Sequence, residues 1–136
     1  MMNHDVSPDV QKSEEEWKAL LSPDAYHILR EAGTERPFTG ALTDEHRVGT
    51  FSCAACGADL FTSDAKFESH CGWPSFTHPD EQQNVRLLDD HSHGMVRTEV
   101  RCKACDSHLG HVFDDGPSPR KTRYCINSLS MTFRPT

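Results

Sequence analysis

Two short stretches, Cys53-Ala-Ala-Cys56 and Cys102-Lys-Ala-Cys105, decide how this chain folds. In each of these hooks two residues separate the cysteines, a spacing that lets both thiolates face one tetrahedral ion, at about 2.3 Å for zinc. Four thiolates complete the coordination sphere and leave no position for water or substrate. We therefore predict one structural zinc ion per chain that clamps the two halves of the fold together. The predicted ligands are Cys53, Cys56, Cys102 and Cys105.

Two other interpretations of the hooks fit the sequence less well. A pair of redox-active Cys-x-x-Cys motifs, as in thioredoxin-like proteins, needs a strand-to-helix context that neither hook clearly has. A catalytic zinc site of the base-deaminase type needs His-x-Glu and Pro-Cys-x-x-Cys. Here Ser52 and Arg101 precede the hooks, and no His-x-Glu occurs. Structural zinc is therefore the favoured interpretation.

The bulk composition narrows the class of protein. The chain has 136 residues, of which 35% are hydrophobic, and a formal net charge of −7. One domain of this size with so few apolar residues gains from a metal staple. Because basic residues cluster no further than Arg120-Lys121, we expect no nucleic-acid partner. No apolar run approaches the roughly 18 residues of a membrane helix, so we expect no membrane association.

The beginning of the chain differs from the rest. Residues 1–12 are interpreted as a flexible polar leader, and residues 13–136 as one domain. Met1 to Val10 contain no basic segment followed by an apolar stretch, so we expect no secretory signal and a cytoplasmic location. Cysteines in a reducing compartment are first candidates for metal binding or catalysis rather than for disulfides. We also expect a monomer.

The order of local signals predicts a short helical N-terminal arm followed by a mainly β, mostly antiparallel domain. Ser13 and Glu16 form a capping box for one helix, and Ser22-Pro23 begins a second helix that Gly33 closes. From about residue 48 the segments are short, β-branched or aromatic, and separated by turn residues, a pattern typical of strands. The predicted strands are 48–52, 66–69, 85–88, 95–101, 110–113, 123–128 and 129–134, with a turn at 114–117.

With four cysteines assigned to zinc, Cys71 and Cys125 remain for chemistry. A strand over residues 123–127 places Arg123, Cys125 and Asn127 on one face. An adjacent arginine favours the reactive thiolate, and the Asn127 amide can donate a hydrogen bond to a developing oxyanion. The alternative is an inert core cysteine. Two polar neighbours on the same face favour a functional Cys125, since an inert core face should be apolar.

The segment His70-Cys-Gly-Trp-Pro74 reads as a turn because it contains a glycine and a proline. Such a loop can move, as a cysteine that resolves an intermediate must, but a packed loop cysteine explains Cys71 equally well. Trp73 and Phe113 are core aromatic residues by default. The alternative is an apolar wall for a methyl or thioether group.

Two histidines, His108 and His111, stand three residues apart in His-Leu-Gly-His. This spacing suits metal binding, but four cysteines already satisfy the zinc ion. The histidines can instead supply a proton near a thiolate. The alternative is a pair of surface or hydrogen-bonded histidines.

Four longer motifs follow one another along the chain: Cys-Gly-Trp-Pro-Ser-Phe (71–76), Arg-Thr-Glu-Val-Arg-Cys (97–102), His-Leu-Gly-His-Val-Phe (108–113) and Arg-Tyr-Cys-Ile-Asn-Ser (123–128). With Arg-Pro-Phe-Thr-Gly (36–40) and both zinc hooks, they resemble the B-type peptide methionine-(R)-sulfoxide reductases. The resemblance runs from about residue 14 to residue 134. It implies a β-rich fold with two antiparallel sheets.

The resemblance also implies an activity. An enzyme of this family reduces the R epimer of methionine sulfoxide in oxidised proteins, which repairs oxidative damage, and thioredoxin is its usual reductant. Cys125 matches the nucleophile and Cys71 the resolving position. The matching polar residues that orient the sulfoxide oxygen and its water are His108, His111 and Asn127. The matching substrate pocket residues are Trp73, which holds the substrate methyl group, Phe113 and Arg123.

In the implied mechanism, Cys125 attacks the sulfoxide sulfur while His108 or His111 supplies a proton. Cys125 becomes a sulfenic acid, Cys71 condenses with it to form a disulfide, and an external dithiol restores both thiols. The family usually has glycine where His70 stands, and often proline where Asp114 stands. His70 bears on the mobility of the loop around Cys71 and therefore on recycling.

Two rival functions make different predictions. A non-catalytic zinc-ribbon interaction module predicts that Cys71 and Cys125 are unreactive and dispensable. A thiol oxidoreductase that acts on protein disulfides predicts activity without any need for Trp73.

Overall fold

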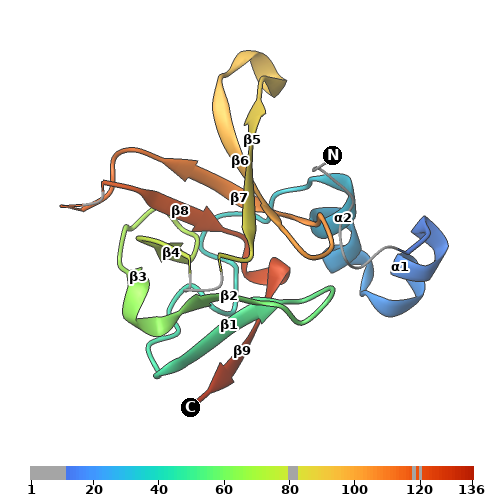
Figure 1. Cartoon of the computed structure of the whole chain (residues 1–136), viewed down its shortest axis with the longest axis horizontal. Coiled ribbons are helices and arrows are strands. Elements are labelled where there is room, and N and C mark those ends of the chain that lie inside the picture. The colour runs from blue at the N-terminus through green and yellow to red at the C-terminus, as the bar shows by residue number, and fades with distance from the viewer. Residues whose placement is uncertain (1–11, 80–82, 118, 120) are drawn as a thin grey trace, which may run out of the picture.

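Two short helices lie beside two antiparallel β-sheets (Figure 1). The computed structural model describes residues 12–79, 83–117, 119 and 121–136. The leader predicted for residues 1–12 lies outside these residues, apart from Lys12. The predicted fold class, a mainly β chain with two antiparallel sheets and a short helical N-terminal arm, is confirmed.

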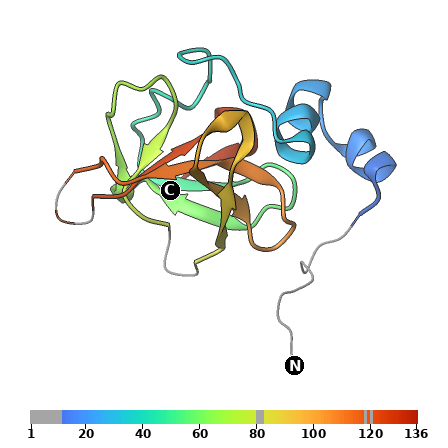
Figure 2. The ribbon, with the colours of Figure 1, turned by 90° about the horizontal axis from the view of Figure 1, so that it is seen from above.

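The helices form an arm at one side of the sheets (Figure 2). They are α1 (Glu14–Leu20) and α2 (Pro23–Glu31). The predicted capping box is present, because the Glu16 N–H donates to Ser13 Oγ and the Ser13 N–H donates to Glu16 Oε1. Helix α2 closes on Ala32, which takes the left-handed conformation (φ 56°), and not on the predicted Gly33. Within the described residues, no helix is long and apolar enough to cross a membrane.

Buried and stacked side chains fix the arm to the β domain. Trp17 of α1 is fully buried, and the Arg30 guanidinium of α2 lies 4.8 Å from the centre of its ring. Arg30 also donates to the carbonyl oxygen of Cys105 at 2.9 Å. The arm therefore contacts the second cysteine hook directly.

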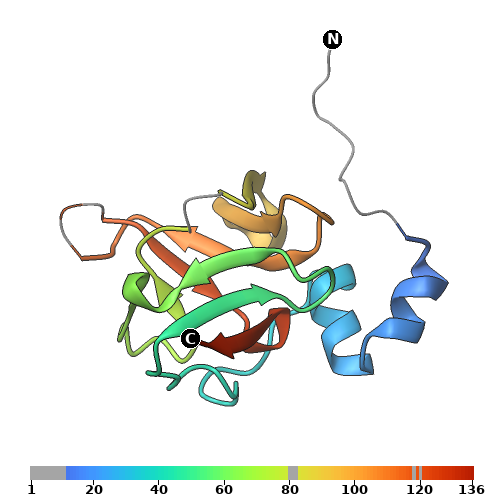
Figure 3. The ribbon, with the colours of Figure 1, turned by 60° about the horizontal axis from the view of Figure 1, so that its bottom comes forward.

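The strands form a three-stranded sheet in the order β2-β1-β9 and a six-stranded sheet in the order β3-β4-β8-β7-β6-β5. Figure 3 shows the green strands of the smaller sheet in front of the larger one. The strands are β1 (Gly49–Cys53), β2 (Asp59–Thr62), β3 (Lys66–Phe67), β4 (Ser75–Phe76), β5 (Val85–Asp90), β6 (Arg97–Cys102), β7 (His108–Phe113), β8 (Arg123–Ile126) and β9 (Met131–Pro135).

The short strands β2 and β4 were not predicted, and the bounds of the other strands differ from the predicted ones by a few residues. The largest change is at the predicted strands 123–128 and 129–134, which the 3-10 turn η3 (Ser128–Ser130) separates. This turn is stable because serine hydroxyls satisfy backbone groups around it. The Leu42 N–H donates to Ser128 Oγ at 3.2 Å, and Ser130 Oγ donates to the His108 carbonyl at 3.1 Å. The turn moves the chain from the larger sheet to the smaller one.

Aromatic rings fill the space between the two sheets. The rings of Phe61 and Phe76 stack with centroids 4.3 Å apart, and Phe51 meets Phe76 edge-on at 5.0 Å. All three side chains are fully buried, so they anchor the sheets to each other. Alternation in β8 turns Tyr124 and Ile126 into this core, which leaves its other face for the site described below.

Candidate active site and metal centre

The four hook cysteines converge on one point. Cys53 Sγ lies 3.7 Å from Cys105 Sγ, and Cys56 Sγ lies 3.6 Å from Cys102 Sγ. All four sulfur atoms lie within 4.8 Å of one another. Sulfur atoms placed tetrahedrally about 2.3 Å from a shared ion are about 3.8 Å apart, so the cluster has the dimensions of a tetrahedral metal site. Because β1 and β6 belong to different sheets, an ion here would hold the sheets together.

The two hooks reach this geometry through the same turn. The Gly57 N–H donates to the Cys53 carbonyl at 2.8 Å, and the Asp106 N–H donates to the Cys102 carbonyl at 2.7 Å. Gly57 and Asp106 both take positive φ angles, 84° and 66°. Glycine adopts this region freely, and aspartate tolerates it better than most residues. Each hook is therefore shaped by hydrogen bonds of its own backbone.

The electrostatics of the cluster favour a cation. Hydrogen bonds from neighbouring thiols, that of Cys102 first, lower the pKa of Cys56 to about 7 and also lower the pKa of Cys105. The same contacts raise the pKa of Cys53 and Cys102. Four thiols this close do not all ionise alone, because their charges repel one another. A divalent cation would remove that penalty and bind four thiolates.

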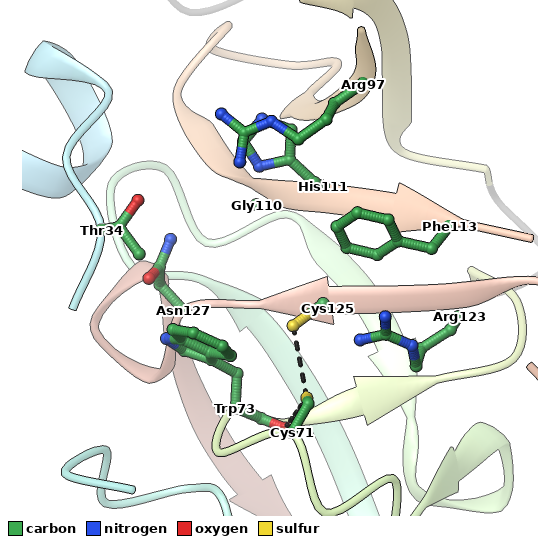
Figure 4. A pocket seen from close by; sticks show the side chains of 10 residues that line it. All are labelled: Thr34, Cys71, Trp73, Arg97, Gly110, His111, Phe113, Arg123, Cys125 and Asn127. Carbon is green, nitrogen blue, oxygen red and sulfur yellow. Dashed lines mark hydrogen bonds between the residues drawn. The ribbon is translucent and has the colours of Figure 1, made fainter. Parts of the chain in front are cut away.

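A cavity of about 220 Å³ holds the two remaining cysteines (Figure 4). Seven of the eight predicted catalytic and substrate-binding residues line it, and the exception is His108. The lining residues are Thr34, Cys71, Trp73, Arg97, Gly110, His111, Phe113, Arg123, Cys125 and Asn127.

The two cysteines of the cavity meet although 54 positions separate them in sequence. Strand β4 pairs with β8 so that Ser75 lies opposite Cys125, and the loop before β4 brings Cys71 Sγ to 3.5 Å from Cys125 Sγ. Burial alone would raise the pKa of the Cys71 thiol, but hydrogen bonds with the hydroxyls of Ser69 at 3.0 Å and Ser75 at 3.4 Å help to lower it. These hydroxyls therefore favour the thiolate form of Cys71.

The pKa of Cys125 is shifted in the opposite direction. Burial raises the pKa of Cys125 well above its ordinary value, and the negative charge of Cys71 adds to the rise. Arg123 opposes this, as the sequence predicts, but its guanidinium is paired with Asp115 at 2.8 Å and stacks over Phe113 at 4.5 Å. The predicted effect of Arg123 on Cys125 therefore has the expected direction, and burial is the larger influence on the pKa of this thiol.

The backbone of Glu35 holds two residues of the cavity, Trp73 and Asn127, by hydrogen bonds. The Glu35 carbonyl accepts from Trp73 Nε1 at 3.0 Å, and the Glu35 N–H donates to Asn127 Oδ1 at 3.0 Å. Asn127 Nδ2 donates to the Leu109 carbonyl at 3.0 Å. These bonds fix the orientation of the Asn127 amide and leave one of its N–H groups for a ligand. Trp73 and Phe113 present aromatic faces to the same cavity (Figure 4).

The two histidines have different positions. His111 lines the cavity, and its Nε2 lies 2.7 Å from Asp90 Oδ2. His108 is buried behind it, with Nδ1 2.7 Å from Glu99 Oε2, and its Nε2 has no hydrogen-bond partner among the described residues. Their rings meet edge-on with centroids 5.5 Å apart. Of the two, only His111 lies at the cavity surface.

Comparisons with known proteins identify the family. The sequence model of the SelR domain matches residues 21–135. The chain is similar to the peptide methionine sulfoxide reductase MsrB of Thiobacillus denitrificans, with 57% identity over 130 residues, 96% of this chain and 98% of that protein. It is 55% identical to MsrB of Alteromonas mediterranea over 133 residues, 98% and 94% of the two chains. MsrB of Methanosarcina barkeri is 57% identical over 125 residues, 92% and 88% of the two chains.

This chain belongs to the MsrB family. It is a methionine sulfoxide reductase and therefore an oxidoreductase. The resemblance seen in the sequence motifs is confirmed, and the two rival functions, an interaction module and a disulfide oxidoreductase, fall away.

The loop around Cys71 has a backbone that favours glycine at two positions. His70, where the family usually has glycine, takes a positive φ of 62°, a conformation that glycine adopts freely and histidine does not. Gly72, two residues on, also has a positive φ, of 97°. A Cβ on Gly72 would lie 2.6 Å from Pro37 Cβ, so the loop around Cys71 fits closely against residues 37–38.

Sequence reasoning missed four groups of this MsrB site. Thr34, Arg97 and Gly110 line the cavity, and Asp90 contacts His111. Arg97 begins one of the recognised motifs, which was a usable signal. No sequence motif marked Thr34 or Asp90. Each lies on a segment that is distant in sequence and meets the site only in the folded chain.

Proposed function

We propose that the chain reduces the R epimer of methionine sulfoxide in oxidised proteins, through a Cys125 sulfenic acid and a Cys71–Cys125 disulfide. The observation that carries this proposal is the pair of thiols 3.5 Å apart inside a cavity that both aromatic and polar side chains line. Trp73 and Phe113 suit the substrate methyl group, whereas His111 and Asn127 suit its oxygen. Separate groups for the methyl group and for the oxygen distinguish the two configurations at sulfur.

In the first step the Cys125 sulfur attacks the sulfoxide sulfur. The proton of Cys125 has a nearby acceptor in the Cys71 sulfur, 3.5 Å away, where neighbouring hydroxyls favour negative charge. The sulfoxide oxygen receives a proton from His111, and the oxygen passes to the cysteine sulfur. Methionine leaves, reduced by two electrons, and Cys125 becomes a sulfenic acid. His108 belongs to the same step as the residue that packs behind His111.

The second step needs little movement. The Cys71 sulfur attacks the Cys125 sulfenic acid, an S–S bond forms, and the oxygen leaves as water. The sulfur atoms need to approach from 3.5 Å to about 2.05 Å, a change that rotation of the Cys71 side chain and adjustment of its loop would supply. A dithiol then reduces the disulfide and returns both cysteines to thiols.

We propose that the tetrahedral cluster binds one structural zinc ion. The donors Cys53, Cys56, Cys102 and Cys105 are all thiolate ligands, which zinc prefers at closed sites. The ion would join the two sheets and take no part in the reaction. Metal analysis of the protein purified without added metal tests this proposal, with about one zinc per chain expected. Iron or an empty site in the folded protein contradicts it.

The partners follow from the chemistry of the cycle. We propose thioredoxin as the dithiol reductant and oxidised proteins as the substrates, acted on by a monomer. We also propose a cytoplasmic location, because a cycle whose working form has two reduced cysteines is favoured in a reducing compartment.

Single-turnover reduction of a methionine sulfoxide peptide tests the reaction. The pre-reduced protein, without added reductant, should convert the R epimer up to about one equivalent, lose two thiols and leave the S epimer intact. Cys125→Ser should abolish conversion. The matched variant Cys71→Ser should still convert one equivalent, at a reduced rate, but should fail to recycle with thioredoxin. Conversion of the S epimer, or normal recycling by Cys71→Ser, would overturn the proposal.

A further inference from the structure

His111 is held by a carboxylate from a different strand. Asp90, the last residue of edge strand β5, places Oδ2 2.7 Å from His111 Nε2 on β7. The hydrogen bond from His111 is the first cause of a pKa at Asp90 well below its usual range, so the carboxylate is ionised. An ionised carboxylate only accepts hydrogen bonds, and therefore His111 Nε2 carries a hydrogen.

Asp90 is itself fixed in place. The Ser92 N–H donates to Asp90 Oδ1 at 2.9 Å, which uses the oxygen that does not face the histidine. Arg97 Nη2 lies 3.4 Å from Asp90 Oδ2, and Arg97 also lines the cavity. The side chain of Asp90 is 18% exposed, and that of His111 is 12% exposed. A contact this well shielded and braced orients a ring far better than an exposed ion pair would.

This contact decides which nitrogen of His111 is left free for a ligand. In neutral His111 the hydrogen is on Nε2, so Nδ1 is a bare acceptor and has no proton to give. Only the imidazolium form donates from Nδ1. The Asp90 carboxylate stabilises that form. Without it the ring would be free to choose the other tautomer and other orientations.

We propose that Asp90 is a positioning residue of the reductase step: it holds His111 by Nε2, so that Nδ1–H delivers the proton to the sulfoxide oxygen. This inference rests on the proposed function. The Nδ1–H bond breaks as the O–H bond forms, and neutral His111 remains bound to Asp90 until it takes up a proton from solvent. A carboxylate that orients a catalytic imidazole in this way acts on rate rather than on substrate affinity.

Other groups around His111 set the sign of the pH dependence. Burial is the first cause of a lowered pKa at His111, and the positive charge of Arg97 adds to it, while Asp90 opposes both. The titratable and charged groups that face the ring are Asp90 on β5, Arg97 and Glu99 on β6, His108 on β7 and Cys125 on β8. Removing Asp90 takes away the carboxylate bonded to His111 and leaves Arg97 without its partner. The imidazolium should then be lost at lower pH.

Three variants of the zinc-loaded full-length chain test the inference by single-turnover kinetics with the R-sulfoxide peptide. Asp90→Ala should lower the saturating rate constant by about 100-fold, and Asp90→Asn, which keeps an acceptor, by about 10-fold. Both should leave the peptide concentration for half-saturation unchanged and move the decline of rate with rising pH to lower pH. The control Asp89→Asn removes the same charge from the exposed neighbouring side chain and should match the wild type in both respects.

A second measurement reads the tautomer directly. Nitrogen NMR of His111 should report Nε2–H as the neutral form in the wild type and in Asp89→Asn, but a mixture of tautomers in Asp90→Ala. The inference would be overturned if the Asp90 variants had wild-type rates and pH profiles. It would also be overturned if they changed only the peptide concentration for half-saturation and not the saturating rate constant. If Asp90→Ala fails to fold, the conservative Asn variant decides. A wild type that reduces neither epimer would refute the proposed function instead, and the NMR result would still test the contact.

Discussion

Truncation of Asn127 should destabilise the fold and the site together. This side chain is 3% exposed and joins two distant segments. It accepts from the Glu35 N–H at 3.0 Å and donates to the Leu109 carbonyl at 3.0 Å. Asn127→Ala removes both bonds and admits no partner in their place. Because the Glu35 carbonyl also holds Trp73, the aromatic wall should loosen as well.

The two lost bonds have unequal consequences. The Glu35 N–H becomes a buried donor without a partner, which costs about 1–3 kcal/mol. The Leu109 carbonyl still accepts from the Asn127 backbone N–H at 2.9 Å, so losing its second bond costs only about 0.5–1.5 kcal/mol. We therefore expect a loss of about 1.5–4.5 kcal/mol in the free energy of unfolding. The free energy of unfolding of a single domain is about 5–15 kcal/mol, so the variant should still fold at low temperature.

Urea unfolding of the zinc-loaded protein, followed by tryptophan fluorescence, measures this loss. With a denaturant slope of about 2 kcal/mol per molar, the midpoint should fall by about 1–2 M. Asn127→Asp keeps the acceptor for Glu35 but places an oxygen against the Leu109 carbonyl. Its defect should shrink as pH falls and the carboxyl regains a hydrogen. A loss below about 1 kcal/mol in Asn127→Ala, or no pH dependence in Asn127→Asp, would refute the reasoning.

Two further predictions concern β7 and β6. Gly110→Ala would place a Cβ 2.1 Å from the Cys125 carbonyl oxygen, so β7 and β8 must separate. We expect the free energy of unfolding in urea to fall by about 1–3 kcal/mol and the rate of the first step to fall as well. A wild-type rate would show that the strands separate without moving Cys125. Burial opposes ionisation of Glu99, but hydrogen bonds from His108 and Arg101 hold its pKa at about 2, against 4.5 for an ordinary glutamate. Because this pKa is lowered by folding, its stabilising contribution is complete above about pH 4.5 and is lost as pH falls toward about 2. Glu99→Gln should therefore lose less stability than the wild type between about pH 5 and about pH 3, and equal losses would contradict the reasoning.

Features that depend on neighbours in sequence could be predicted well. The two hooks depend on a two-residue spacing, and the capping box on Ser13 and Glu16 lying three apart. The alternation of β8 separates Cys125 from the core residue Tyr124 in the same local way. The short strands β2 and β4 were missed because strands of two to four residues are held by pairing with other strands and show little pattern of their own.

The amino-acid sequence specifies the chemistry that is available: four cysteines at zinc-binding spacing, two further thiols, two histidines and an aromatic pair. Which of these groups meet depends on how the strands and loops are arranged in space. Sheet order brings Cys71 to Cys125 across 54 positions and Asp90 to His111 across 21, and it leaves His108 behind the cavity wall. The physical reason is that such contacts depend on strand register and on loop closure between distant segments. Neither strand register nor loop closure can be predicted from the neighbours of a single residue in sequence.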